Sequence, residues 1–107
     1  IVPWMSMAAP HIHKGLQVGI DAGIRTMAEA MPYCMMEGYE DNVSEKYIPP
    51  GEIRDIDSVT LDWTSVRQNT NKVKFKQCTK CSRFKECEGT WKEYPDRRGN
   101  EEFQPLQ

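Results

Sequence analysis

Four cysteines are the residues of this chain whose type and spacing are best suited to chemistry. Cys78 and Cys81 form a Cys-x-x-Cys pair, while Cys87 and Cys34 stand alone. Two thiolates at the Cys-x-x-Cys spacing on a tight turn can point at one metal centre. Cys87 can face the same point if it lies one turn into a helix, and Cys34 follows a strand-ending proline. The sequence therefore predicts a metal centre whose ligands are Cys34, Cys78, Cys81 and Cys87.

The identity of the metal stays open between an iron–sulfur cluster and zinc. Structural zinc sites with four cysteines often use two Cys-x-x-Cys pairs, whereas this chain has one. A [4Fe–4S] cluster spreads its four ligands more widely than a single ion does, which favours the cluster and leaves Zn²⁺ as the alternative. His11 and His13 lie far from the cysteines in the sequence and are interpreted as surface residues.

Two other uses of the cysteines fit less well. Nothing in the sequence indicates secretion, and two disulfides would not explain the close grouping of Cys78, Cys81 and Cys87. A thioredoxin-type redox pair requires a complete thioredoxin-like fold around it, and the sequence does not predict one.

Composition and charge narrow the class of protein. The 107 residues are 38% hydrophobic, and no apolar run approaches the ~20 residues that a membrane span requires. Neither a signal peptide nor a membrane partner is expected, and we predict a soluble, cytoplasmic protein. Acidic residues gather in 37–62 and basic residues in 72–98, within a net charge of −2. These segments can attract each other, or the bases can stabilise an anionic cluster.

A nucleic-acid-binding module is the least favoured alternative. The basic residues of 72–98 could contact phosphates, but aromatic residues do not alternate with them as a stacking surface would require.

The first part of the chain resembles one unit of an α/β protein. Pro10 suits the start of a helix, and an apolar stripe at four-residue spacing follows it, formed by Ile12, Leu16 and Ile20. Gly23 suits the position just after the helix, and Ile24–Met31 alternates as a strand does. Because a lone strand is unstable in water, this unit is expected to be the end of a larger protein, with an exposed edge that predicts self-association.

The second part shows a different pattern. Residues 32–57 have little periodicity and predict an irregular crossing. Residues 59–66 and 73–75 alternate around a polar turn at 68–71, which indicates a β-hairpin. A final helix of about three turns is predicted from the apolar spacing, with Pro95 and Gly99 at its end, and its apolar face comprises Phe84, Cys87, Trp91 and Tyr94. The predicted class is α+β, with parts 1–31 and 32–107.

A resemblance to a known family comes from the cysteine segments. Residues 78–94, CTKCSRFKECEGTWKEY, together with Gly99, Glu102, Phe103 and Pro105, resemble the C-terminal twitch or SPASM extension of radical SAM enzymes. Residues 31–40, MPYCMMEGYE, resemble the segment that leaves the barrel of these enzymes and supplies an early cysteine. The family often has a further cysteine three residues after the third of this group, and here that position is Trp91.

The resemblance implies a role for each part. Residues 1–31 would be the last helix and strand of a β/α barrel, and residues 32–107 would carry one auxiliary [4Fe–4S] cluster. The CxxxCxxC motif of radical SAM enzymes is absent, so no catalytic residue is assigned and the chain alone cannot start the radical reaction. S-adenosylmethionine would bind only in the remainder of the parent, and the expected partner is the rest of its barrel.

Overall fold

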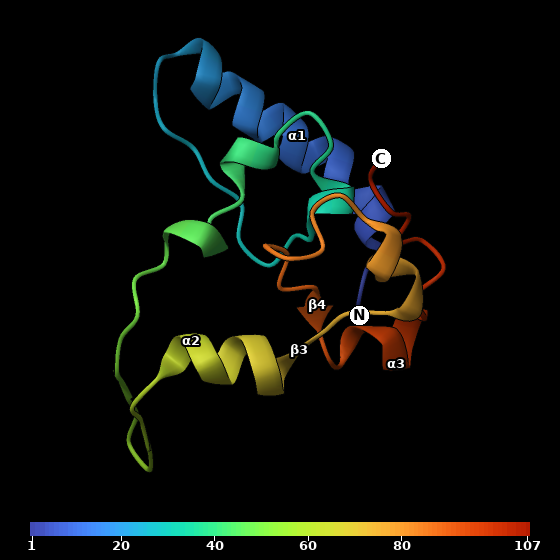
Figure 1. Cartoon of the computed structure of the whole chain (residues 1–107). Coiled ribbons are helices and arrows are strands. Elements are labelled where there is room, and N and C mark those ends of the chain that lie inside the picture. Colours follow the sequence, from blue (N-terminus) through green and yellow to red (C-terminus); the bar gives the residue numbers. More distant parts are fainter.

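The computed structural model describes all 107 residues, and its class is α+β (Figure 1). The helices are α1 (Met5–Asp21), α2 (Trp63–Val66) and α3 (Tyr94–Arg98). Two antiparallel sheets of two strands each complete the fold. The first pairs β1 (Ile53–Arg54) with β2 (Val59–Thr60), and the second pairs β3 (Lys72–Val73) with β4 (Thr90–Trp91). The predicted class is confirmed, although several predicted elements are not.

Helix α1 begins five residues before the predicted start. Pro10 lies inside the helix, so its missing N–H removes one helical hydrogen bond. Contacts from the C-terminal segment stabilise the extra turn. The backbone N–H of Met5 donates to the Tyr94 hydroxyl (2.9 Å) and to Glu102 Oε1 (3.2 Å). Gly23 does follow the helix end with a left-handed φ of 72°, as predicted.

The buried face of α1 also differs from the predicted stripe. Leu16 is buried and Ile12 packs against the core, but Ile20 is 43% exposed. A helix has about 3.6 residues per turn, so a strict four-residue spacing drifts away from the core by ~40° at each step. Gly19 takes the next buried position, and its backbone lies close to Thr26.

The predicted strand Ile24–Met31 is absent. Its only ladder contact is a parallel bridge between Ala28 and Val43, with hydrogen bonds from Ala28 N to Asn42 O (2.8 Å) and from Ser44 N to Ala28 O (3.0 Å). Ala30 has a φ of 63°, which no extended strand contains. The buried Glu45 carboxylate accepts the Ala30 N–H at 2.7 Å and thereby supports this turn.

The predicted hairpin between 59–66 and 73–75 is wrong. β2 pairs with β1, which comes before it, and β3 pairs with β4. The residues between are helical, with α2 running into a π-helical turn at Arg67–Asn71. Asp62 explains the difference, because its Oδ1 accepts the Ser65 N–H at 3.1 Å and caps the start of α2.

The predicted long C-terminal helix is also wrong. Residues 82–86 form turns, Cys87 lies in a loop, and only Tyr94–Arg98 is helical. Gly89 breaks the helical pattern with a φ of 86°. Pro95 lies in the first turn of α3 and does not end the helix, while Gly99 follows the last helical residue.

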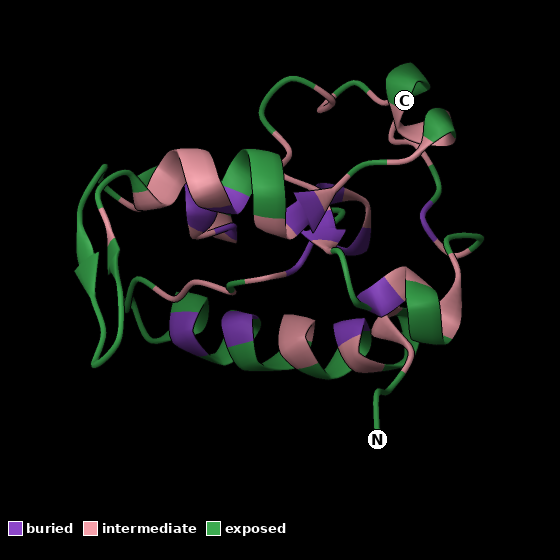
Figure 2. Cartoon of the chain, turned by 90° about the horizontal axis from the view of Figure 1, so that it is seen from below, coloured by how far each residue is buried: buried purple, intermediate pink, exposed green.

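The core is small and joins both parts of the chain. Figure 2 shows the buried positions of α1 on the side that faces the other segments, and the β1–β2 hairpin exposed at one edge. The apolar core consists of Ala9, Leu16, Met31, Tyr33, Met35, Met36, Val43, Tyr94 and Phe103. The predicted irregular crossing, residues 32–57, holds three short 3-10 turns up to Tyr47, but it also contains β1, which the sequence did not predict. None of the helices combines the length and the apolar character needed to cross a bilayer.

The two helical glycines of α1 should respond oppositely to alanine. A Cβ at Gly15 meets nothing within 4 Å, whereas a Cβ at Gly19 would lie 2.1 Å from Thr26 Cγ2. Gly15→Ala should therefore raise the free energy of unfolding by about 0.5–1 kcal/mol through helix propensity. Gly19→Ala should lower it by about 1–3 kcal/mol through overpacking. Thermal unfolding of both variants checks this, and equal shifts would contradict the packing of α1 on Thr26.

Candidate metal centre

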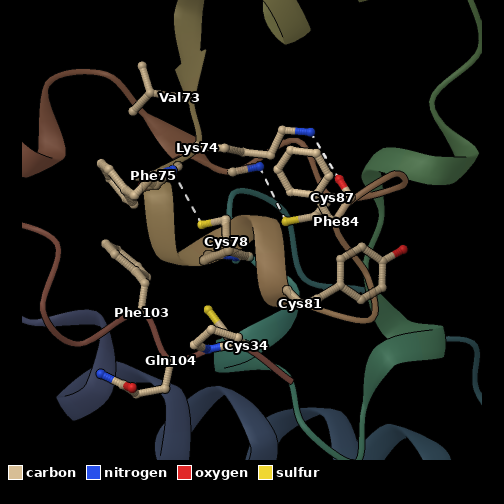
Figure 3. A pocket seen from close by; sticks show the side chains of 15 residues that line it. Cys34, Val73, Lys74, Phe75, Cys78, Cys81, Phe84, Cys87, Phe103 and Gln104 are labelled. Carbon is tan, nitrogen blue, oxygen red and sulfur yellow. Dashed lines mark hydrogen bonds between the residues drawn. The ribbon is translucent and has the colours of Figure 1, made fainter. Parts of the chain in front are cut away.

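All four cysteines line a single hollow in the structure. The hollow contains about 430 Å³ of empty space, part of it open to solvent, and most of the residues that line it are hydrophobic. None of the cysteines forms a disulfide, and all four are half-buried. Figure 3 shows them gathered between the rings of Phe75, Phe84 and Phe103. The structure thus brings Cys34 to the Cys78–Cys87 segment from more than forty residues away in the sequence.

Cys78 and Cys81 are positioned by one tight turn. Cys78 lies in the 3-10 helix Lys76–Lys80, and Cys81 follows the last residue of that helix. The Cys78 N–H donates to Phe75 O (3.0 Å), and the Cys81 N–H donates to Cys78 O (2.9 Å). A 3-10 turn places residues three apart over one another, so both thiols are presented on the same side.

Cys87 reaches the hollow by a turn and not by the predicted helix. Its N–H donates to Arg83 O at 3.0 Å, which closes the loop between Cys81 and Cys87. The next residues leave this loop through Gly89, where a Cβ would lie 2.0 Å from Val73 O. Only glycine fits this position, because the backbone conformation and the close approach to β3 both exclude a side chain.

Cys34 lies in the 3-10 turn Tyr33–Met35, which α1 holds in place. His13 Nε2 donates to the Met35 carbonyl at 2.8 Å, and the His13 ring stacks on Tyr39 with centroids 4.7 Å apart. His13 is therefore a half-buried packing residue, which corrects its interpretation as a surface residue, while His11 is exposed as predicted. Neither histidine lines the hollow.

Backbone N–H groups point at two of the sulfurs. Phe75 N donates to Cys78 Sγ and Gly89 N donates to Cys87 Sγ, each at 3.3 Å. Such donors stabilise a thiolate, and in iron–sulfur proteins they raise the reduction potential. The sequence did not predict these two donors, and only the glycine two residues after Cys87 hinted at one of them.

The thiols also interact electrostatically with one another. Burial, followed by the charges of Cys87, Cys78 and Cys81, raises the pKa of Cys34 to about 12. Burial likewise raises the pKa of Cys87, although backbone N–H donors oppose the increase. Four thiolates in this hollow would repel one another and would require a compensating positive charge. A bound metal ion would supply that charge and would favour deprotonation of the thiols that it binds.

Aromatic rings close the apolar side of the hollow. Phe75 stacks on Phe103 with centroids 5.4 Å apart, and Tyr94 meets the edge of Phe103 at 5.6 Å. Lys74 lies over the Phe84 ring and its Nζ donates to Phe84 O at 3.0 Å. These contacts hold the walls in place and limit the access of water to the sulfurs.

The four thiols line the hollow but do not form a ready single-ion site. Nowhere do three side chains from His, Cys, Asp or Glu lie close enough together to hold a single metal ion. The potential metal ligands that line the hollow are all cysteine sulfurs, with no histidine or carboxylate among them. A purely sulfur donor set is one that iron–sulfur clusters and zinc both accept.

Comparisons with protein-family models, curated proteins and solved structures find no match to this chain.

The raised pKa of Cys34 predicts an unusual pH dependence of thiol alkylation. The thiolate is the reactive form, so the alkylation rate of Cys34 in the metal-free chain should still increase above pH 10. A peptide covering residues 31–37 is the control, and its rate should level off above its ordinary pKa of about 8.5. Mass spectrometry of the alkylated peptides measures both rates. A plateau for Cys34 below about pH 10 in the folded chain would contradict its burial beside three thiols.

Proposed function

We propose that this chain binds one [4Fe–4S] cluster on Cys34, Cys78, Cys81 and Cys87. The observation that carries the proposal is the shared hollow, which all four thiols line and to which no histidine or carboxylate contributes. Cysteine thiolates are the usual ligands of such clusters, with one cysteine for each iron. Zinc, which takes four such ligands as a tetrahedron, is the alternative.

Three features of the hollow fit a cluster and its chemistry. Its walls are largely apolar, N–H groups donate to two sulfurs, and the set provides four thiol ligands. A bound cluster would supply the capacity to accept and release one electron. With four cysteine ligands no iron stays open for substrate, so electron transfer or stabilisation of the fold is the role that we propose for it.

We further propose that the chain is the C-terminal part of a radical SAM enzyme. Support comes from the resemblance of 31–40 and 78–105 to the twitch or SPASM extension, together with the position of these two segments at one hollow. In this proposal the CxxxCxxC motif, the S-adenosylmethionine site and most of the barrel belong to the remainder of the parent. Residues 1–31 would contact that remainder.

Metal analysis tests the cluster. Protein purified without oxygen should contain about four irons and four acid-labile sulfides per chain, with little zinc. Alanine at any one of the four cysteines should reduce both counts at least several-fold, because a cluster that lacks one of its four protein ligands is held less tightly and is lost during purification. Ser82→Ala is the matched control, since Ser82 is exposed, follows Cys81 directly and does not line this hollow. One zinc per chain without sulfide would contradict the proposal.

A further inference from the structure

A buried network of four charged side chains lies behind the Cys87 loop. Arg67 donates from Nε to Glu88 Oε2 (2.7 Å) and from Nη2 to Glu88 Oε1 (2.8 Å). Lys72 Nζ lies 2.6 Å from Glu45 Oε1 and 3.3 Å from Glu88 Oε2. The side chains of Arg67 and Lys72 are 1% exposed, and those of Glu88 and Glu45 are 6% and 7% exposed. Two cations and two anions thus form an electrically neutral group.

This network is directly connected to the proposed cluster ligand. Glu88 follows Cys87 in the chain, and Gly89, which comes next, donates its N–H to Cys87 Sγ. The clamp on Glu88 therefore fixes the middle residue of the Cys87–Gly89 turn. Together with the close approach of Gly89 to Val73 O, it holds the sulfur and its N–H donor in place relative to each other.

The β3–β4 ladder separates the network from the hollow. Val73 pairs with Thr90, and both residues line the hollow. Lys72 pairs with Trp91, and its Nζ lies 5.0 Å from the centre of the Trp91 ring. Because successive residues of a strand point to opposite faces, the charges of the network act on the hollow across a single layer of backbone.

Geometry favours the charged forms of Arg67 and Glu88, because two hydrogen bonds at 2.7 and 2.8 Å join the guanidinium to the carboxylate. Solvent screens buried charges much less than exposed ones, so their effect extends to neighbouring groups.

We propose that Glu88 is a positioning residue for the Cys87 ligand, and that the neutral Arg67–Lys72–Glu45–Glu88 network sets the reduction potential of the cluster. This inference rests on the proposed function, since it requires a cluster in the hollow. Reduction adds negative charge to the cluster, so a net positive network favours the reduced form and a net negative network disfavours it.

Two substitutions change the network charge in opposite directions. Glu88→Gln leaves it at +1 and should raise the midpoint potential of the cluster. Lys72→Met leaves it at −1 and should lower the potential. A role limited to structural support would not produce shifts of opposite sign. The measurement is a potentiometric titration of cluster-loaded protein, followed by electron paramagnetic resonance.

Glu86→Gln is the matched control, because Glu86 and Glu88 flank Cys87 symmetrically. Glu86 pairs with Arg83 at 2.7 Å, but these side chains are 42% and 39% exposed. The Glu86→Gln variant also loses one carboxylate, but it should shift the midpoint potential less than Glu88→Gln does, since solvent and salt screen the exposed pair. Because Glu86 and Glu88 are both adjacent to Cys87 in the sequence, the difference between the two potential shifts reports the effect of burial and not that of sequence position.

The outcomes separate this inference from the proposed function. Shifts of opposite sign for Glu88→Gln and Lys72→Met, both larger than that for Glu86→Gln, support it. Equal potentials in all variants, or shifts of one sign, overturn the inference while the cluster proposal stands. If the Glu88→Gln variant does not retain a cluster, the Lys72→Met variant alone tests the inference. An unchanged or raised midpoint potential of Lys72→Met then overturns the inference. Absence of a cluster from the unsubstituted protein refutes the proposed function itself.

Discussion

The placement of four ionisable thiols around one apolar hollow is the constraint on which the rest of the structure depends. Burial and mutual repulsion raise the pKa of Cys34 to about 12, so the thiolates that a metal needs are unfavourable until the metal binds. In the proposed function, metal binding would therefore be coupled to the local fold. The segments around the hollow consist of 3-10 turns, loops and two-residue strands, which gain little stability from their own backbone hydrogen bonds.

The remaining stabilising contacts are few, and they converge on the same region. The nine apolar core residues link α1 to the Cys34 turn and to the C-terminal segment. The Arg67–Glu88 and Lys72–Glu88 pairs link the π-helical turn and β3 to the Cys87 loop. The Lys72–Glu45 pair links β3 to the 3-10 turn Glu45–Tyr47. A small core with buried ion pairs contributes modest stability. In the proposed function, a bound cluster would join the Cys34 turn through one sulfur to the Cys78–Cys87 segment through three, and would thereby add to the stability of these short elements.

The sequence predicted the grouping of the four cysteines better than the elements that carry them. Cys78 and Cys81 are close in the chain, so their spacing alone specifies a shared direction. Two segments were predicted wrongly for different reasons. Around Cys87, an apolar spacing resembles a helix, but Gly89 interrupts it. At Asp62, a side-chain cap starts a helix inside a pattern that alternates as a strand does. The sequence did not single out Lys72 and Glu88 as a buried pair, because a buried ion pair leaves no periodic pattern in the sequence. Only the fold reveals it.

The most direct test of the account is the identity of the group between the four sulfurs. Crystals of the protein, grown without oxygen, can be measured on both sides of the iron and zinc absorption edges. The account predicts one compact cluster of about four irons in the hollow, bonded to Cys34, Cys78, Cys81 and Cys87 and bounded by Phe75 and Phe103. A single zinc peak, or iron that leaves Cys34 unbound, would contradict it.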